Sequence, residues 1–203
     1  MTSHLIPAAI FELCYDCAER VYSTRPPNTR YAGLTARLLF GTATHESAGF
    51  AHTRQIGYSL TDPRGAWSYW QLEWASILDS ITYLRHHDPL ARNVALFLEL
   101  LDHDWFAPLL LSLPALNSVP LHRKLAFLNL IRTWPRLAVV LARLHYLRFP
   151  EPIPAPVSDQ AAYWKRTYNT VLGRGTADAY LASWHSWAAP AVHNFNSRPS
   201  ERN

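Results

Sequence analysis

The spacing of apolar residues constrains this chain most, because they recur three and four positions apart through most of its 203 residues. In residues 5–22, for example, Ile10, Cys14, Cys17 and Val21 fall on one face of a helix with 3.6 residues per turn. The pattern predicts a mainly α-helical protein. Helices are expected over residues 5–22, 31–48, 67–84, 90–101, 120–132, 136–147, 159–167 and 176–188.

Proline and glycine mark the predicted breaks between these helices. Residues 149–156 hold four prolines and read as an extended connector, which no helix interior tolerates. Residues 51–65 are polar and predict a small loop or a β-hairpin, with a candidate strand at 55–60. The part after the connector is too small to fold alone. We therefore expect one domain over residues 1–193, followed by a polar tail at 194–203.

Composition excludes several classes of protein. A hydrophobic share of 49% and an aromatic share of 13% argue against a disordered chain. Two cysteines cannot form a disulfide framework. The N-terminus lacks a basic region and predicts no secretory signal. Residues 105–116, the most apolar stretch, are shorter than the roughly 20 residues of a membrane span. We expect a soluble protein made in a cytoplasm.

The most informative residue is Glu46, which is predicted in the last turn of an apolar helix that stops at Gly49. The negative end of the helix dipole disfavours an ionised carboxylate there, and burial against neighbours such as Phe40 acts in the same direction. A glutamic acid with a raised pKa can donate a proton near neutral pH. The alternative is a solvated glutamate near a helix end.

Two later blocks give Glu46 a context. Residues 64–71, which we expect to open the next helix, read Arg-Gly-Ala-Trp-Ser-Tyr-Trp-Gln, and residues 168–173 read Tyr-Asn-Thr-Val-Leu-Gly. With Glu46-Ser47, these blocks resemble, in order, the motifs of phage-encoded lytic transglycosylases of the goose-lysozyme-like superfamily. The resemblance touches about 30 residues between 44 and 175. It implies a single, mainly α, lysozyme-like domain, with the loop or hairpin inserted after the helix of the catalytic glutamate.

The resemblance also implies an activity and a role for each residue. Glu46 would protonate the glycosidic oxygen between N-acetylmuramic acid and N-acetylglucosamine in peptidoglycan, with no cofactor. It would then act as base on the muramoyl 6-hydroxyl, which closes an anhydro ring. Ser47 and Gln71 would hydrogen-bond substrate or fix Glu46, Tyr168 would support its carboxyl, and Asn169 would hold the loop. Tyr168 is equally well read as a core tyrosine with a satisfied hydroxyl.

Departures from the family pattern leave alternatives open. Ser68 stands where the family has a central glycine, between the bulky Trp67 and Tyr69. A second hypothesis is therefore a phage virion structural or ejection protein that keeps the fold without turnover. A third is a hydrolytic muramidase with Asp62 as its second carboxylate, although Asp62-Pro63 is also an ordinary turn start.

Partners and location follow from the resemblance. Peptidoglycan glycan strands are the expected substrate, and other phage virion proteins are possible partners. The expected location is the virion, or the host cytoplasm before delivery to the periplasm. The basic residues from 132 to 148 read as a helix face with little aromatic interleaving, so nucleic-acid binding is not expected.

Metal binding is the main rival chemistry, and the spacing argues against it. His45, Glu46 and His52 do not form H-E-x-x-H, whose histidines lie four residues apart on one helix face. Cys14 and Cys17 cannot close a zinc site by themselves and are expected to be buried. We predict no metal site. Three tryptophans at helical spacing are read mainly as core residues, at positions 67, 70 and 74.

Overall fold

The computed structural model describes residues 5–22, 27–99, 119–169 and 173–196. These residues are mainly helical and contain no strand, which confirms the predicted class. In chain order the helices are α1 (Leu5–Arg20), α2 (Thr29–Glu46), α3 (Trp74–Arg85), α4 (Asp88–Phe97), α6 (Leu121–Thr133), α7 (Pro135–Leu147), α8 (Val157–Trp164), the π-helix η2 (Lys165–Asn169), α9 (Ala177–Ser183), the π-helix η3 (Trp184–Ala188) and α10 (Ala189–Asn196).

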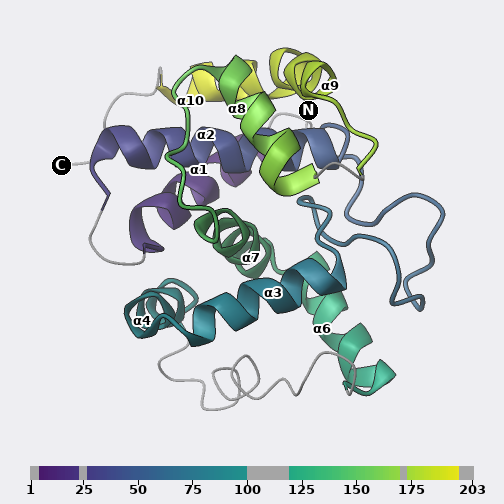
Figure 1. Cartoon of the computed structure of the whole chain (residues 1–203). Coiled ribbons are helices and arrows are strands. Elements are labelled where there is room, and N and C mark those ends of the chain that lie inside the picture. Colours follow the sequence, from purple (N-terminus) through teal and green to yellow (C-terminus); the bar gives the residue numbers. More distant parts are fainter. Residues whose placement is uncertain (1–4, 23–26, 100–118, 170–172, 197–203) are drawn as a thin grey trace.

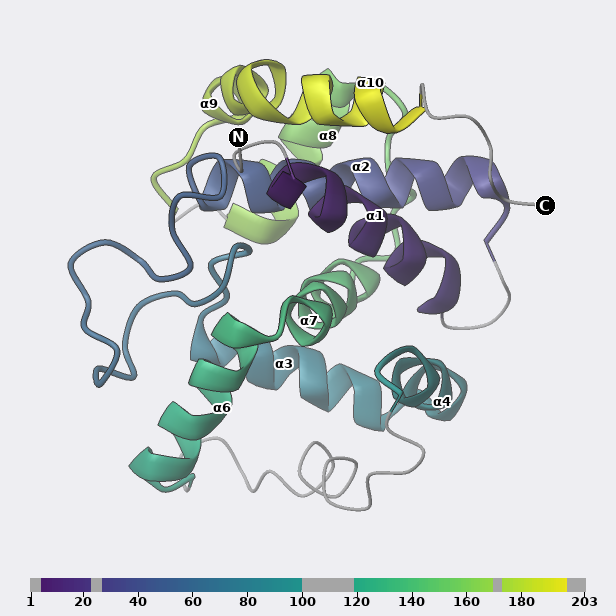
Figure 2. The same cartoon turned by 180° about the vertical axis from the view of Figure 1, so that it is seen from behind.

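Helix α7 lies at the centre of the molecule. Every residue from Leu137 to Tyr146 is buried. The two opposite views show α1 and α2 on one side of α7 and α3 and α4 on the other, with α8, α9 and α10 stacked over α2 (Figures 1 and 2). The apolar faces predicted from the sequence thus meet around one central helix, and Cys14 and Cys17 are fully buried among them, as expected.

Local chemistry explains where several helices begin. The Asn28 side chain accepts a hydrogen bond of 2.8 Å from the Tyr31 amide and caps α2. Thr176 caps α9 through the Ala179 amide at 3.1 Å. Pro135 occupies the first turn of α7, where a missing N–H costs nothing.

The helix predicted from residue 67 begins only at Trp74, so that boundary was wrong. Ser68 and Gln71 have φ values of 67° and 45°, in the left-handed region that a right-handed helix cannot contain. Trp67 instead exchanges backbone hydrogen bonds with Leu72, at 3.0 and 2.8 Å. Residues 67–73 therefore form a compact turn that precedes α3. Trp67 and Trp70 are fully buried, which confirms them as core residues.

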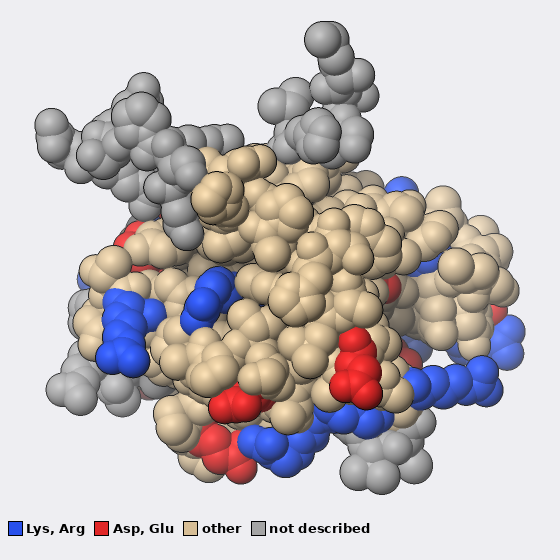
Figure 3. All heavy atoms as spheres, turned by 90° about the horizontal axis from the view of Figure 1, so that it is seen from above, with Lys and Arg blue, Asp and Glu red and all other residues tan. Residues whose placement is uncertain are grey.

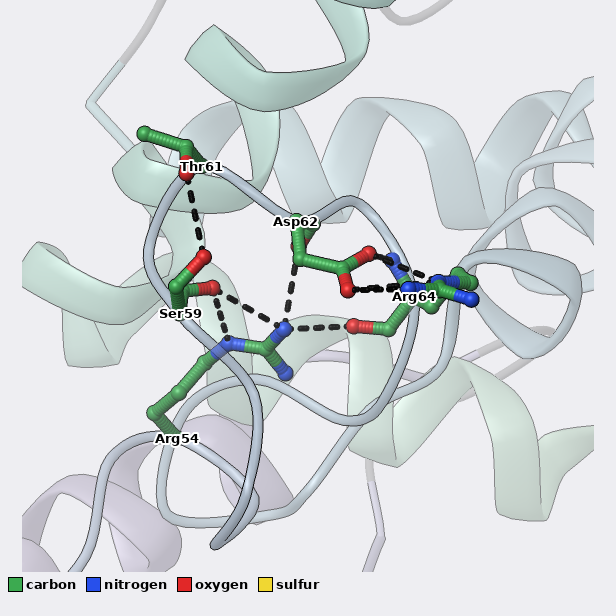
Figure 4. A network of polar contacts seen from close by, with 5 residues as sticks. All are labelled: Arg54, Ser59, Thr61, Asp62 and Arg64. Carbon is green, nitrogen blue, oxygen red and sulfur yellow. Dashed lines mark hydrogen bonds and ion pairs between the residues drawn. The ribbon is translucent and has the colours of Figure 1, made fainter.

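The segment predicted as a loop or hairpin is a loop without a described strand, organised by the Arg54 side chain (Figure 4). The Arg54 guanidinium donates to the carbonyls of four residues and lies over the Trp67 ring, 4.2 Å from its centroid. The accepting carbonyls belong to Ser59, Asp62, Arg64 and Ala66. Two backbone hydrogen bonds of an antiparallel bridge close the base of the loop, from the Gln55 amide to the Ala66 carbonyl at 3.0 Å and from the Ser68 amide to the Thr53 carbonyl at 2.9 Å. The Arg54 side chain adds hydrogen bonds within the loop, which therefore holds its shape without a sheet.

Helical structure extends further at the C-terminal end than the sequence pattern predicted. The connector at residues 149–156 contains no helix, as expected, and α8 follows it. From Ala177 the chain is helical through η3 and on to Asn196, so residues 194–196 of the expected polar tail belong to α10. Seen from above, uncharged side chains fill most of the middle of the face over α8–α10, and charged ones lie mainly toward one edge (Figure 3).

No single described helix is long and apolar enough to cross a membrane. Helices α6 and α7 meet that criterion only as a pair, and they are bent by 100° at the break between them. The apolar stretch at residues 105–116 lies outside the described residues.

Candidate active site

Glu46 is the last residue of α2 and its side chain is half-buried. Burial raises the pKa of Glu46 from 4.5 to about 7, and the negative charge of Glu73 acts in the same direction. The Trp164 indole opposes this rise in pKa, because its Nε1–H donates to Glu46 Oε1 at 3.1 Å and favours the carboxylate. The balance leaves a carboxyl group that is mostly protonated below pH 7.

The indole that holds Glu46 is itself fixed by neighbouring rings. Trp164 is fully buried at the end of α8. The His45 ring meets it edge-on with centroids 4.7 Å apart, and the Tyr180 ring lies 5.2 Å away on α9. His45 Nδ1 in turn lies 2.9 Å from the Ser183 hydroxyl. The hydrogen-bond donor to Glu46 is therefore held in place by α2, α8 and α9.

The chain turns sharply directly after Glu46. Ala48, Gly49 and Phe50 all have positive φ values, of 52°, 69° and 68°. Ser47 stabilises this turn, because its buried hydroxyl donates to the Ala43 carbonyl at 2.6 Å and accepts from the Phe50 amide at 2.8 Å. The Ser47 hydroxyl is thus bonded to the backbone of the helix end and of the turn that follows Glu46.

Tyr168 connects this region to the turn before α3. Its hydroxyl donates to the Trp70 carbonyl at 2.7 Å. Burial raises the pKa of Tyr168 well above its usual value, and the charge of Glu46 adds to the effect. Tyr168 therefore lies close enough to Glu46 to sense its ionisation, while its hydroxyl is bonded to backbone.

Gln71 belongs to the turn that Tyr168 contacts. Its side-chain amide donates to the Ser68 carbonyl at 2.8 Å, and the Trp70 amide donates to Ser68 Oγ at 3.2 Å. Ser68 adopts the left-handed conformation that favours glycine, so the serine at this position keeps a backbone shape typical of glycine. In this conformation the amide nitrogen of Gln71 is bonded within its own turn.

Asn169 holds the end of the π-helix η2. Its Oδ1 accepts from Lys165 Nζ at 2.8 Å, and the same ammonium donates to the Gly173 carbonyl at 2.8 Å. A Cβ atom on Gly173 would lie 2.2 Å from the Asn169 carbonyl oxygen, so this close approach requires glycine. Residues 170–172 of the third motif lie outside the described residues.

The structure relates three of the five candidate residues to one another and gives the other two supporting positions. The charge of Glu46 acts on Tyr168, and the Tyr168 hydroxyl is bonded to the carbonyl of Trp70, the residue before Gln71. Ser47 lies beneath the turn after Glu46, and Asn169 anchors the chain beyond Tyr168.

Two residues that act on Glu46 were not predicted from the sequence. Trp164 lies outside the three motif blocks, and no local signal identifies it as the partner of a glutamate 118 positions away. Glu73 lies two residues after Gln71. Its effect on Glu46 could not be predicted from local patterns, because the two residues are far apart along the chain. Asp62, the second carboxylate considered from the sequence, instead binds Arg64 with a shortest contact of 2.8 Å, which lowers the pKa of Asp62 to about 2 (Figure 4).

Within the described ranges, no three His, Cys, Asp or Glu side chains gather in a way that could hold a metal ion. Comparisons with known proteins add no further assignment: no protein-family model, no curated protein and no solved structure matches this chain.

Proposed function

We propose that this protein is a peptidoglycan-cleaving lytic transglycosylase with a lysozyme-like domain, encoded by a phage and carried in its virion. One observation carries the proposal: Glu46 ends a helix as a half-buried carboxyl group whose pKa is raised to about 7. A general acid works best when its pKa lies near the working pH. The resemblance of the three sequence blocks supplies the substrate, the glycan strand of peptidoglycan.

In the proposed reaction, protonated Glu46 donates its proton to the glycosidic oxygen between N-acetylmuramic acid and N-acetylglucosamine. The C–O bond to that oxygen breaks, and N-acetylglucosamine leaves with the proton. The Glu46 carboxylate then removes the proton of the muramoyl 6-hydroxyl as that oxygen bonds to C1. The anhydro ring closes, and Glu46 is protonated again without a second carboxylate or a water molecule.

The groups around Glu46 support both protonation states that this cycle needs. Burial stabilises the neutral acid, while the Trp164 indole donates a hydrogen bond that stabilises the carboxylate between the two steps. Tyr168 holds the 68–71 turn through the Trp70 carbonyl. That turn is where the resemblance places contact with the sugar chain.

A hydrolytic muramidase is the second candidate, and Glu73 is the observation that favours it. Glu73 is exposed at the start of α3, and its charge acts on Glu46. A second carboxylate in that position can activate a water molecule instead of leaving the muramoyl hydroxyl to attack. In this alternative Glu73 takes the role first considered for Asp62.

The test combines a zymogram on purified peptidoglycan with mass spectrometry of the products. We expect clearing by the wild type, none by Glu46→Gln, and normal clearing by the control Glu12→Gln, an exposed glutamate of α1. Anhydro-muramic ends support the transglycosylase. Reducing ends together with inactivity of Glu73→Gln would establish the hydrolase, and absence of clearing by the wild type would favour a non-catalytic virion protein.

A further inference from the structure

His145 lies beside the candidate active site, and no sequence motif pointed to it. It belongs to the central helix α7 and is 5% exposed. Its Nε2 lies 2.9 Å from the Thr167 carbonyl oxygen, which can only accept a hydrogen bond. Its Nδ1 lies 3.1 Å from an Arg148 guanidinium nitrogen, which can only donate, and 2.8 Å from the Ser76 hydroxyl. These partners require a neutral ring with its proton on Nε2.

The partners of His145 belong to the elements that build the site. Thr167 directly precedes Tyr168 in η2, and the Tyr168 ring lies 4.7 Å from the His145 ring. Ser76 is in the first turn of α3, just after the 68–71 turn. One imidazole thus ties α7 to both segments that Tyr168 joins by its hydrogen bond to the Trp70 carbonyl.

We infer that neutral His145 is a positioning residue that holds Tyr168 and the 68–71 turn beside Glu46, and that its protonation releases them. Protonation would place an N–H on Nδ1. That atom already accepts hydrogen bonds from the Arg148 guanidinium and the Ser76 hydroxyl, so the new N–H would face two donors. The charged and titratable groups that face the ring are Arg148 directly after α7, Asp79 of α3, Tyr146 of α7 and Tyr168 of η2.

Asp79 does not offer the protonated ring a free counter-ion, because it already binds Arg148 at 3.0 Å. Burial and Arg148 lower the pKa of His145 to about 4, which outweighs the opposite effects of the Thr167 carbonyl and Asp79. The release is therefore an acid-side event, separate from the ionisation of Glu46 near pH 7.

The inference rests on the proposed function for one readout, the pH profile of peptidoglycan cleavage. His145→Gln keeps one N–H for Thr167 and one oxygen acceptor for Ser76 and Arg148, but it does not titrate. We expect the wild-type kcat/KM to fall about tenfold for each pH unit below the pKa of His145, because the released turn contacts the sugar chain. The Gln variant should not show this loss. The control His185→Gln, at an exposed position of η3, should behave like the wild type.

A second readout needs no activity. Nitrogen-15 NMR of the wild-type imidazole should show the Nε2–H tautomer at pH 6, and the Tyr168 and Gln71 amide signals should shift with the His145 titration. An Nδ1–H tautomer would overturn the inference even if the protein cleaves peptidoglycan. The same holds if the Tyr168 and Gln71 amide signals do not shift as His145 titrates. The inference would also be overturned if His145→Gln lost as much cleavage activity at acid pH as the wild type. If no substrate is cleaved, the proposed function fails and the NMR result still decides the role of His145.

Discussion

Ionisation of the half-buried Glu46 should lower the free energy of unfolding, because its pKa is raised in the folded state. Replacing Glu46 with Gln should remove this destabilisation. In the unfolded chain the carboxyl titrates near 4.5, whereas in the folded protein it titrates at about 7. Between these values the folded state binds more protons, so stability falls as pH rises. The contribution of the protonated acid is fully present below the unfolded pKa and is lost as pH rises to the folded pKa and beyond.

The size of the effect follows from the two pKa values. At about 1.4 kcal/mol per pKa unit, moving the pKa from 4.5 to about 7 corresponds to about 3 kcal/mol of unfolding free energy. Glutamine cannot ionise, and its amide oxygen can still accept the hydrogen bond from Trp164. Glu46→Gln should therefore match the wild type at pH 4 and exceed its stability by about 2–3 kcal/mol at pH 8.5.

Urea unfolding followed by tryptophan fluorescence measures this difference directly. Other titrating groups contribute equally to both proteins, so the difference between them isolates Glu46. The control Glu12→Gln should differ from the wild type by the same small amount at both pH values. A gap for Glu46→Gln that stays constant from pH 4 to pH 8.5, or a variant less stable than the wild type at pH 8.5, would refute a raised pKa and with it the basis of the proposed acid catalysis.

Three further predictions concern neighbouring features. Trp164→Phe removes the donor that favours the carboxylate, so the pKa of Glu46 should rise and the alkaline limb of the pH–activity profile should move to higher pH. Gly41→Ala places a Cβ 2.2 Å from the Tyr180 hydroxyl, so thermal unfolding should show a loss of about 1–3 kcal/mol. Arg54→Ala removes the donor to four loop carbonyls, so limited proteolysis should cleave that loop faster than in the wild type, and equal rates would contradict its organising role.

Much of the fold was predictable because it depends on local patterns. The spacing of Ile10, Cys14 and Cys17 is typical of a helix with one buried face, and these residues are buried in α1. Val21, the next residue of that pattern, is buried directly after the helix. The prolines of residues 149–156 exclude a helix whatever surrounds them. The start of α3 was not predictable, because the left-handed turn at Ser68 and Gln71 depends on packing of Trp67 and Trp70 that no local pattern encodes.

Local sequence patterns predicted a mainly helical chain and singled out Glu46 at a helix end, because both depend on residues within a few turns of one another. The partners of that glutamate were decided by tertiary structure alone. Trp164 and Glu73 approach it only after α8 and α3 are placed, and His145 meets Thr167 and Ser76 only where three helical segments converge. The pKa of a carboxyl group depends on burial and on charges nearby in space, and helical periodicity carries no information about either.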